Sequence, residues 1–372
     1  MTQAVFKKHQ VEELKAIVQE CYSKKVFLVH HKNSYYTSGA ESFIQKLLGK
    51  CNSVSFFEFT PNPQIEDLKR GIALFKKDNF DLIIAIGGGS VLDMAKLISI
   101  FAHQESDVED VVVGKGRIGD VKTPLIAIPT TAGTGAEATQ FAVLYIEKNK
   151  YSVEHPLILP DYVFLSSEFS LTASPYLTAC TGLDAFCQAV ESAWSVNANE
   201  EAETYALRAI DIIWNNLQKA VLDQNPTARE QMQEAAFLAG KAISITKTTA
   251  PHALSYAFTS YYGIPHGHAV ALSLPYFLTY NYAVTDDNCM DPRGVASVKN
   301  RIDNVLRIIK KDIKDAPTAL IDFFKTLGIN IDIPTLIENI DTNLIVSNVN
   351  TQRLTNNPRA VSHNDLRTFL QA

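Results

Sequence analysis

The feature that most constrains the fold of this 372-residue chain is a short apolar run that ends in three glycines, "DLIIAIGGGS" (81–90). A run of this length, bounded by glycine, is typical of a buried strand rather than a helix. Similar strand-like runs occupy 24–31, 54–59 and 123–131, and helical patterns near 40–50, 64–78 and up to 102 separate them. Alternation of this kind predicts a doubly wound α/β domain with a mostly parallel sheet.

The pattern changes after about residue 168. Four long segments with apolar residues three and four positions apart follow, which predicts helices. They are "TACTGLDAFCQAVESAWS", "EEAETYALRAIDIIWNNLQKAV", "REQMQEAAFLAGKAIS" and "ASVKNRIDNVLRIIKKDIKD". Because 372 residues are too many for one ordinary core, we expect two domains. The predicted boundaries are 1–168 for the α/β domain and 169–372 for a helical domain, with 299–315 presenting a solvated charged face.

Composition narrows the class of protein. A hydrophobic content of 46%, a charged content of 20% and a net charge of −6 indicate a globular protein and argue against a nucleic-acid-binding surface. No run has the length of a membrane span or the pattern of a signal peptide. The 5 cysteines are odd in number and lack CxxC spacing, so we expect a reduced, cytoplasmic protein.

The three glycines predict a phosphate site. Without Cβ atoms, Gly87, Gly88 and Gly89 let backbone N–H groups approach a phosphate, and the start of the following helix favours its negative charge. The pattern is neither GxGxxG nor a P-loop. Ser90 and Asp93 have the spacing of a capping box, so an alternative interpretation is that they only begin the helix.

A second polar loop follows the next predicted strand. The stretch "PTTAGTGAEAT" contains Thr130, Thr131 and Thr134. Two such loops at the ends of strands in one sheet suit a nucleotide with several polar groups. Together they predict a nucleotide-binding domain.

Two histidines suggest a metal site. His252 and His266 are 14 residues apart, which on an unbroken helix would separate them by roughly 21 Å. Gly263 and Pro265 lie between them and are strong helix breakers, so a turn there lets the two rings converge. His268 follows closely, but a packing role is the simpler interpretation for it.

Further ligands are available on one predicted helix. Asp184 and Gln188 are at i and i+4 and therefore share a face. Two histidines and a carboxylate with an open position recur in Fe(II) and Zn(II) sites, and Gln188 would add a neutral oxygen. In the alternative interpretation, Asp184 begins a helix and Gln188 makes an interfacial hydrogen bond.

Together these motifs resemble the iron-containing (group III) alcohol dehydrogenase family over nearly the whole chain. The matching landmarks, in family order, are "PNP" (61–63), "AIGGGSVLDMAK" (85–96), "PTTAGTGAEAT" (129–139), "TGLDAFCQAVE" (181–191), "PHALSYAFTSYYGIPHG" (251–267) and "NNPRAVSHNDL" (356–366). The resemblance implies an NAD(P)-binding α/β domain, an all-α domain, a dehydroquinate synthase-like architecture and a catalytic divalent metal, Fe(II) or Zn(II). It also implies a small-molecule substrate and a homo-oligomer such as a dimer.

The resemblance assigns roles to individual residues. The metal ligands would be Asp184, His252 and His266, with Gln188 in the place of the family's usual further histidine. The cofactor would be held by Gly87, Gly88, Gly89, Ser90, Asp93, Thr130, Thr131, Thr134 and Lys150, with Lys150 near the nicotinamide ribose.

Three other departures from the family pattern concern the chemistry. Tyr256 stands where many members have a proton-relaying histidine. His31 replaces a common aspartate after the first main strand; such an acid binds the ribose hydroxyls of NAD and repels the extra phosphate of NADP. With Lys32 adjacent, this favours the use of NADPH. Lys241 and Lys247 stand where small apolar residues are usual; for both the alternative is a solvated helix end.

A cation at Lys247, five residues before His252, would suit an anionic substrate. Arg353 and Arg359 would add anion contacts if the C-terminal segment covers the site. The pattern looks like the branch that includes phosphonoacetaldehyde reductases, so we expect reduction of phosphonoacetaldehyde to 2-hydroxyethylphosphonate. Hydride would come from the nicotinamide, and the proton through Tyr256, a histidine or water.

Three alternatives stay open. The first is a dehydrogenase of another small or sugar-derived alcohol in the same family. The second is a lyase of the dehydroquinate synthase type, which uses its nicotinamide only transiently. The third is a metal-free nucleotide-binding relative, which Gln188 makes conceivable.

Overall fold

The computed structural model describes residues 3–21, 25–147 and 149–371. The chain forms two compact units, the first from 1–131 and 135–172 and the second from 132–134 and 173–372. The first unit thus extends a few residues past the boundary expected at 168. Within the loop that contains Thr130, Thr131 and Thr134, called here the threonine-containing loop, residues 132–134 belong to the second unit. Within the described residues no helix combines the length and apolarity that crossing a bilayer requires.

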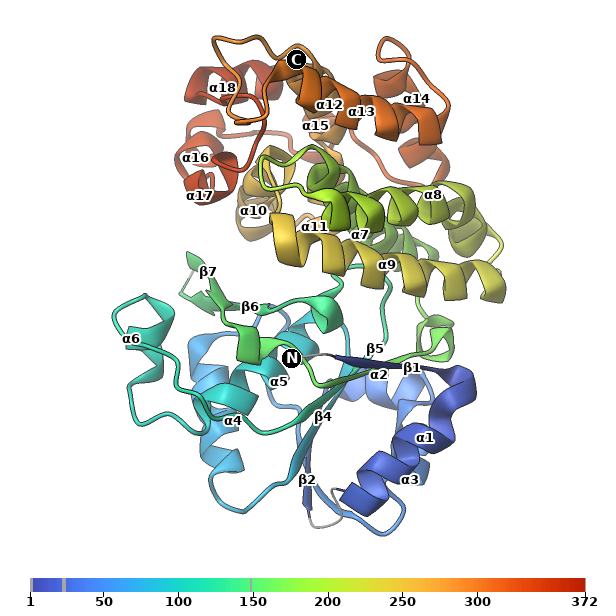
Figure 1. Cartoon of the computed structure of the whole chain (residues 1–372), viewed down its shortest axis with the longest axis vertical. Coiled ribbons are helices and arrows are strands. Elements are labelled where there is room, and N and C mark those ends of the chain that lie inside the picture. The colour runs from blue at the N-terminus through green and yellow to red at the C-terminus, as the bar shows by residue number, and fades with distance from the viewer. Residues whose placement is uncertain (1–2, 22–24, 148, 372) are drawn as a thin grey trace. The chain divides into compact units, whose positions relative to one another are not determined.

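The first unit is built on a parallel sheet of six strands in the order β1-β8-β5-β4-β2-β3. Figure 1 labels four of them, β1, β2, β4 and β5. The strands are β1 (Ala4–Lys7), β2 (Lys25–His30), β3 (Asn52–Phe56), β4 (Leu82–Gly87), β5 (Leu125–Pro129) and β8 (Tyr162–Leu165). All the pairings in this sheet are parallel. This confirms the predicted α/β fold class.

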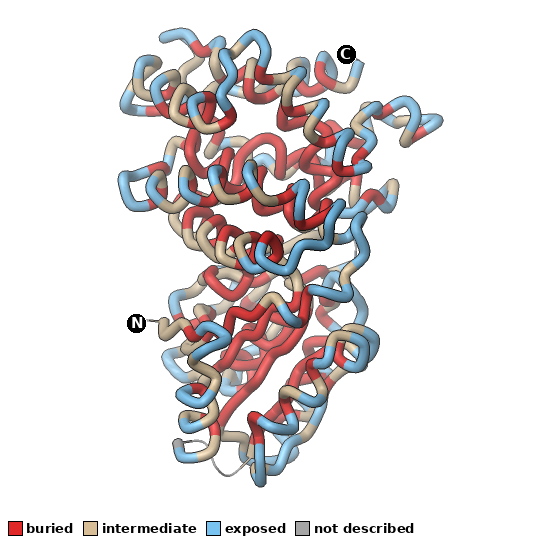
Figure 2. Tube along the Cα trace, turned by 90° about the vertical axis from the view of Figure 1, so that its right-hand side faces the viewer, coloured by how far each residue is buried: buried red, intermediate tan, exposed pale blue. Residues whose placement is uncertain are grey.

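Alternate residues of each central strand enter two different cores. In β2, Phe27 and Val29 pack in one core, and Val26 and Leu28 pack in the other. Helices α4 (Ile65–Phe75) and α5 (Gly89–Phe101) cover the first face, and α1 (Val11–Ala16) and α3 (Ala40–Leu48) cover the second. Because both faces are covered, the central strands are buried along their length, as Figure 2 shows.

The order in which the chain adds strands to the sheet reverses between β2 and β4. From β2 it proceeds outward to β3, and it then crosses back to β4, β5 and β8 on the other side. In open α/β sheets, ligands bind outside the carboxyl ends of the strands at such a switch point. His30 pairs with Ile86 in the β2–β4 ladder, so the ends of these two strands lie side by side.

Smaller elements complete the first unit. An antiparallel hairpin, β6 (Phe141–Ile146) with β7 (Asn149–Glu154), follows the threonine-containing loop. The remaining elements are short: η1 (Lys8–Gln10), η2 (Ile17–Cys21), α2 (Lys32–Thr37), α6 (Val108–Val112), η3 (Ala136–Ala138), η4 (Pro156–Ile158) and η5 (Ser167–Ser170).

The second unit is helical, as predicted. Its longest helices are α7 (Pro175–Trp194), α8 (Glu200–Leu222) and α9 (Pro226–Thr246), which pack against one another. The rest are α10 (Ala250–Tyr262), α11 (His266–Ala271), α12 (Leu274–Tyr282), α13 (Val295–Ile309), α14 (Ala316–Thr326), α15 (Ile333–Leu336), α16 (Thr342–Ser347), α17 (Thr351–Leu354) and α18 (His363–Gln371).

Local sequence explains where the three long helices begin. Each has an N-cap side chain that accepts a hydrogen bond from the first turn: Ser174 for α7, Asn199 for α8 and Asn225 for α9. Proline follows the cap in α7 and α9, where its missing N–H would have no helical partner. From Ala179 to Trp194, α7 is almost wholly buried, so it is the central helix of this unit.

Candidate active site

Three predicted metal ligands converge in the second unit. One ligand atom from each of Asp184, His252 and His266 lies within 4.8 Å of the others. The Asp184 Oδ1 atom is 3.2 Å from His252 Nε2 and 3.9 Å from His266 Nε2. The Asp184 and His252 side chains are 5% and 3% exposed, whereas His266 is 31% exposed, so the cluster opens toward solvent on the His266 side.

The turn between the two histidines has the expected form. Gly263, at a φ of 70°, ends α10 in the left-handed region that glycine adopts without strain. Pro265 is the N-cap residue of α11, which begins at His266. The chain therefore folds back, and the His252 and His266 ring centroids are 5.3 Å apart.

Gly267 allows α11 to approach α7. A Cβ at Gly267 would lie 1.9 Å from the Cys180 carbonyl oxygen and 3.0 Å from the Asp184 Cβ. Only glycine fits so close an approach of two helices. The position of His266 beside Asp184 thus depends on its neighbour having no side chain.

Gln188 provides a test of whether the cluster fits a metal. Its Nε2 atom donates to Asp184 Oδ1 at 3.1 Å, and its Oε1 atom is buried without a hydrogen-bond partner among the described residues. A buried amide oxygen without a partner is unfavourable, and a cation would supply one. Two imidazoles, a carboxylate and this oxygen form a donor set that suits Fe(II) or Zn(II), so the residues present fit a divalent metal.

Glu191 is a functional candidate that sequence reasoning did not single out. It is fully buried on α7, and its Oε1 atom accepts a hydrogen bond from His252 Nδ1. With Asp184 and Gln188 it forms an i, i+4, i+7 series on one helical face, which is the signal that could have identified it.

The charge around His252 is negative. Burial alone would lower the pKa of His252, but the charge of Glu191 and the hydrogen bonds to Asp184 and Glu191 outweigh it and raise the pKa to about 10. A positive charge is therefore favoured beside His252, between the carboxylates of Asp184 and Glu191.

Tyr256 lies beside the cluster. Its ring stacks on that of His266, with centroids 5.8 Å apart and planes inclined by 15°. Both residues are partly exposed, so the phenol lies on the open side of the site. His268, by contrast, is buried and contacts Tyr176 and the Asn330 carbonyl oxygen, which confirms the packing interpretation for His268.

Lys247 has an unusual backbone conformation. Its φ of 60° and ψ of 176° lie in a region that is essentially restricted to glycine. The flanking residues hold it there: the Thr246 carbonyl accepts from Ser195 Oγ at 3.1 Å, and the Thr248 carbonyl accepts from Asn356 Nδ2 at 3.0 Å. Strain of this kind clusters at functional sites.

The other predicted cations have different surroundings. Lys241 donates to the Tyr205 hydroxyl at 2.7 Å, so it belongs to the surface between α8 and α9. Arg359 donates to the Tyr280 carbonyl oxygen at 2.8 Å and lies over the Tyr280 ring. Arg353 lies on α17, which packs against α10, the helix that carries His252.

In the first unit, the glycine turn and the polar loop that were together predicted to bind a nucleotide lie side by side. Thr130 N donates to the Gly87 carbonyl oxygen at 2.9 Å. None of Gly87, Gly88 and Gly89 has a positive φ. A Cβ at Gly88 would stand 3.5 Å from the Thr131 hydroxyl, so Thr131 faces the glycine turn. This arrangement leaves bare backbone at the start of α5, which is favourable for a pyrophosphate.

The capping-box interpretation of Ser90 and Asp93 is wrong. Gly88 is the N-cap residue of α5, and no side chain caps that helix. The Ser90 hydroxyl instead accepts from Asn62 N at 3.1 Å, and Asp93 Oδ2 accepts from Val143 N at 3.1 Å. Long-range contacts with the "PNP" turn and with β6 therefore replace the capping hydrogen bonds that the spacing suggested.

Lys96 ties the two loops of the first unit together. Its buried ammonium donates to the Ala136 carbonyl oxygen at 2.7 Å, the Thr139 hydroxyl at 2.9 Å and the Phe141 carbonyl oxygen at 2.6 Å. Burial lowers the pKa of Lys96 to about 8 and raises that of its buried neighbour Glu137 to about 7. The loop that contains Thr130, Thr131 and Thr134 is thus connected to α5 through a buried ammonium group.

The remaining cofactor candidates lie in two places. Lys150 is on β7, opposite Tyr145 in the hairpin. Thr134 lies in the segment 132–134, which belongs to the second unit. His31 directly follows β2, and its ring lies 4.6 Å from that of Phe59. Burial lowers the pKa of His31, so Lys32 rather than His31 supplies positive charge at this strand end.

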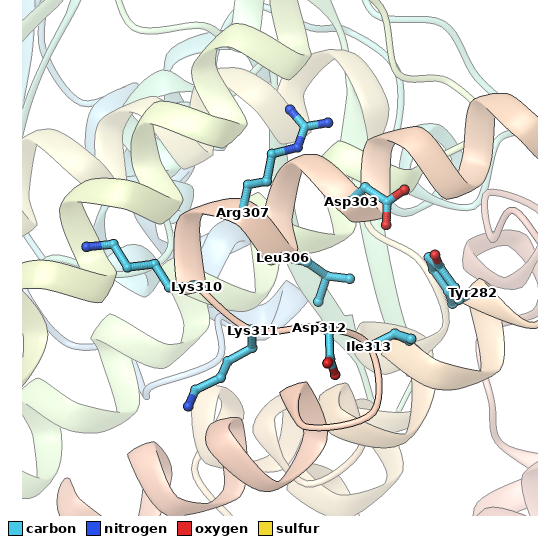
Figure 3. Close-up of a pocket in the computed structure, with 8 residues that line it drawn as sticks. All are labelled: Tyr282, Asp303, Leu306, Arg307, Lys310, Lys311, Asp312 and Ile313. Atoms are coloured by element: carbon cyan, nitrogen blue, oxygen red, sulfur yellow. The ribbon is translucent and has the colours of Figure 1, made fainter.

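A separate pocket of about 610 Å³ lies at the end of α13 (Figure 3). In Figure 3 the side chains of Arg307, Lys310 and Lys311 point in different directions, and Asp303 and Asp312 lie to the other side, toward Tyr282. None of the predicted site residues lines this pocket. Its mixed charges agree with the solvated face expected for this segment.

Comparison with known proteins gives the family. Residues 1–167 match the family model for iron-containing alcohol dehydrogenases, and residues 178–372 match the model for the C-terminal part of the same family. The chain belongs to the iron-containing alcohol dehydrogenase family. Members of this family are oxidoreductases that use NAD(P) and a divalent metal, in agreement with the expected class of enzyme and cofactors.

Three curated relatives carry different names. Long-chain-alcohol dehydrogenase 1 of Geobacillus thermodenitrificans is 36% identical over 60% of this chain and 58% of its own length. A phosphonoacetaldehyde reductase of Streptomyces viridochromogenes is 36% identical over 60% of this chain and 59% of its own length. A choline dehydrogenase of Bacillus subtilis is 30% identical over 89% of this chain and 81% of its own length. The chain thus spans less than two thirds of the first and second of these relatives.

A solved structure agrees in fold. The sulfoacetaldehyde reductase of Bifidobacterium kashiwanohense, solved in complex with NAD+, superposes with a TM-score of 0.88 at 26% identity, over 99% of this chain and 96% of that protein. The likeness covers both units of the chain.

Proposed function

We propose that this protein catalyses the NAD(P)H-dependent reduction of a small aldehyde to a primary alcohol, at a divalent metal held by Asp184, Gln188, His252 and His266. The observation that carries the proposal is the convergence of the two histidines on Asp184, which also accepts from Gln188 Nε2, while Gln188 Oε1 is buried without a hydrogen-bond partner among the described residues. The alternative of a metal-free relative has less support, because such a protein would leave this oxygen buried without compensation.

A metal bound there would supply Lewis-acid polarisation of a carbonyl oxygen, and the nicotinamide would supply the hydride. Buried Asp184 and His252 exclude water from the inner side of the site, and partly exposed His266 leaves an approach for the aldehyde. Tyr256, stacked on His266, provides the proton for the product oxygen. The glycine turn, Ser90, Asp93, Thr130, Thr131, Thr134 and Lys150 hold the cofactor.

We propose an aldehyde with an anionic end as the substrate, and phosphonoacetaldehyde as the specific compound. Lys247 lies five residues before His252 in a strained conformation, and Arg353 lies on a helix that packs against α10. These cations suit a phosphonate better than a neutral or cationic group. The similarity to a phosphonoacetaldehyde reductase agrees with this choice.

Another alcohol is a second candidate. The choline dehydrogenase aligns over 89% of this chain, more than the phosphonoacetaldehyde reductase does, and choline is a cation.

The resemblance to the family further supports a homodimer as the proposed assembly, which light scattering of the purified protein tests.

A substrate panel tests the proposed function. NADPH and NADH oxidation is followed with phosphonoacetaldehyde, acetaldehyde and lactaldehyde, and NAD+ and NADP+ reduction is followed with choline. We expect kcat/KM for phosphonoacetaldehyde to exceed that for either uncharged aldehyde at least tenfold. Equal values would overturn the anionic substrate, and turnover of choline alone would favour the second candidate.

A further inference from the structure

We infer that Glu191 is a positioning residue that fixes the ring of His252 in the one tautomer that can bind a metal, and so sets the metal affinity of the site. The inference rests on the proposed function, because it presupposes a metal at Asp184, His252 and His266. Glu191 is not one of the clustered ligand residues and would act through its contact with His252.

The two oxygens of Glu191 have separate partners. Oε2 accepts from Thr249 N at 2.6 Å, from the Thr249 hydroxyl at 2.8 Å and from His252 N at 3.5 Å. Oε1 accepts from His252 Nδ1. Because the Thr249 hydroxyl also accepts from Trp194 Nε1 at 2.9 Å, its own hydrogen points to Glu191. The orientation of the carboxylate is therefore determined on both sides.

One of these interactions is structural. Thr249 is the N-cap residue of α10, but its own side chain makes no capping hydrogen bond. The Glu191 carboxylate, brought by α7, takes that place and accepts from the N–H of the N-cap residue Thr249 and from the first-turn N–H of His252. Glu191 thus fixes where α10 begins and hence where the His252 backbone lies.

The other interaction determines the chemistry of the ring. A carboxylate only accepts hydrogen bonds, so the Nδ1 atom of His252 must carry the hydrogen between them. Once any hydrogen at Nε2 is lost, the ring is neutral and its lone pair is on Nε2, which faces Asp184 at 3.2 Å. The ring is thereby oriented and made more basic toward a metal at that position.

Among the described residues, His252 is the one side chain that can bring an opposing charge to Glu191. Within the described part of the chain, its only ion pair is with His252, and no Lys or Arg contributes. A carboxylate buried in a low-dielectric interior is costly unless it is compensated. A divalent metal on the far side of the ring would supply that compensation.

Glu191→Gln separates the two roles. The three donors at Oε2 require the amide oxygen of the variant on that side, so its NH2 group must face His252 Nδ1. The ring then accepts at Nδ1 and carries its hydrogen on Nε2, where it blocks the metal. The backbone contacts that begin α10 remain.

Thr249→Ala is the matched control, because it removes a hydroxyl donor to Glu191 and leaves the ring contact. Metal-free wild type and both variants are titrated with Zn²⁺ against a chromophoric chelator, and the melting temperature of each metal-free protein is measured. We expect Glu191→Gln to weaken Zn²⁺ binding about 10- to 100-fold. Its melting temperature should stay within about 3 °C of wild type, because the backbone contacts of Glu191 remain. Thr249→Ala should lower the melting temperature and change Zn²⁺ affinity less than about threefold.

The outcomes separate this inference from the proposed function. If wild type binds Zn²⁺ tightly and Glu191→Gln binds it equally well, the inference is overturned and the metal centre stands. If wild type binds no Zn²⁺, both are overturned. Should Glu191→Gln fail to fold, ¹⁵N NMR of histidine-labelled, Zn²⁺-loaded wild type decides: a hydrogen on His252 Nδ1 supports the inference, and a hydrogen on Nε2 contradicts it.

Discussion

Gly267 lies so close to the Cys180 carbonyl oxygen that a Cβ at Gly267 would stand 1.9 Å from it. This approach of α11 to α7 brings His266 to Asp184. The proposed metal site therefore depends on a glycine that offers no ligand.

Gly267→Ala should abolish the approach. The Cys180 carbonyl belongs to a buried helix and cannot move aside, so α11 must shift, which we expect to destabilise the fold by about 1–3 kcal/mol. Zn²⁺ affinity should fall at least tenfold. Gly263→Ala is the control, because a Cβ there meets no atom within 4 Å and only the positive φ opposes it. Equal Zn²⁺ affinity in wild type and Gly267→Ala would contradict the role of the close approach.

Gln188→His should tighten metal binding. An imidazole is a stronger ligand than an amide oxygen, and the position already lies next to Asp184. We expect roughly tenfold tighter Zn²⁺ binding, or about 1.4 kcal/mol. Gln188→Leu, which has no ligand atom, should weaken it. If both variants bind Zn²⁺ as wild type does, Gln188 is not a ligand.

Lys247→Gly should remove the cation without disturbing the backbone. Glycine adopts the φ of 60° and ψ of 176° without strain, so stability should be retained or should rise by about 1 kcal/mol. The kcat/KM for phosphonoacetaldehyde should fall at least tenfold, and that for acetaldehyde should stay unchanged. Lys241→Gln, which alters a cation bound to Tyr205, is the control. A parallel loss for both aldehydes would show that Lys247 does not recognise the anionic end.

His31→Asp should change the cofactor preference. A carboxylate at the end of β2 would bind ribose hydroxyls and repel the extra phosphate of NADPH. We expect the NADPH:NADH ratio of kcat/KM to fall at least tenfold, whereas His31→Asn should leave it nearly unchanged. If His31→Asp keeps the wild-type NADPH:NADH ratio, residue 31 does not select the cofactor.

Glu137 should make stability depend on pH. Burial raises its pKa from 4.5 to about 7, so the folded protein binds more protons than the unfolded chain between these values. This contribution is therefore complete below pH 4.5 and is lost as the pH rises to 7, by an amount of roughly 3 kcal/mol. In urea unfolding at pH 5, 6 and 7, Glu137→Gln should lack this decline. Parallel profiles for the two proteins would contradict it.

The sequence was sufficient for the periodic parts of this fold. Strand–helix alternation in the first unit and the turn at Gly263 and Pro265 follow from local patterns, and both occur as expected. The motifs also indicated the two histidines and Asp184 as metal ligands, because ligand residue types and helix breakers can be recognised in the sequence itself.

Contacts between segments that are far apart in the sequence could not be predicted from local patterns. Ser90 and Asp93 have capping-box spacing, yet Asn62 and Val143 bind them, because tertiary hydrogen bonds replace the local ones. Glu191 looked like an ordinary helical residue, since its partners come from 58 to 61 positions away. Neither partner can be read from a local pattern.

The most direct test of the proposed metal-centred reductase is a metal titration of its activity. Metal-free protein is supplied with Fe(II) or Zn(II) from zero to two equivalents per chain, and NADPH oxidation by phosphonoacetaldehyde is followed. The expected result is a rate that rises linearly and stops at one equivalent, with no rise in His252→Ala. Full activity in the metal-free protein, unchanged by added metal, would contradict the account.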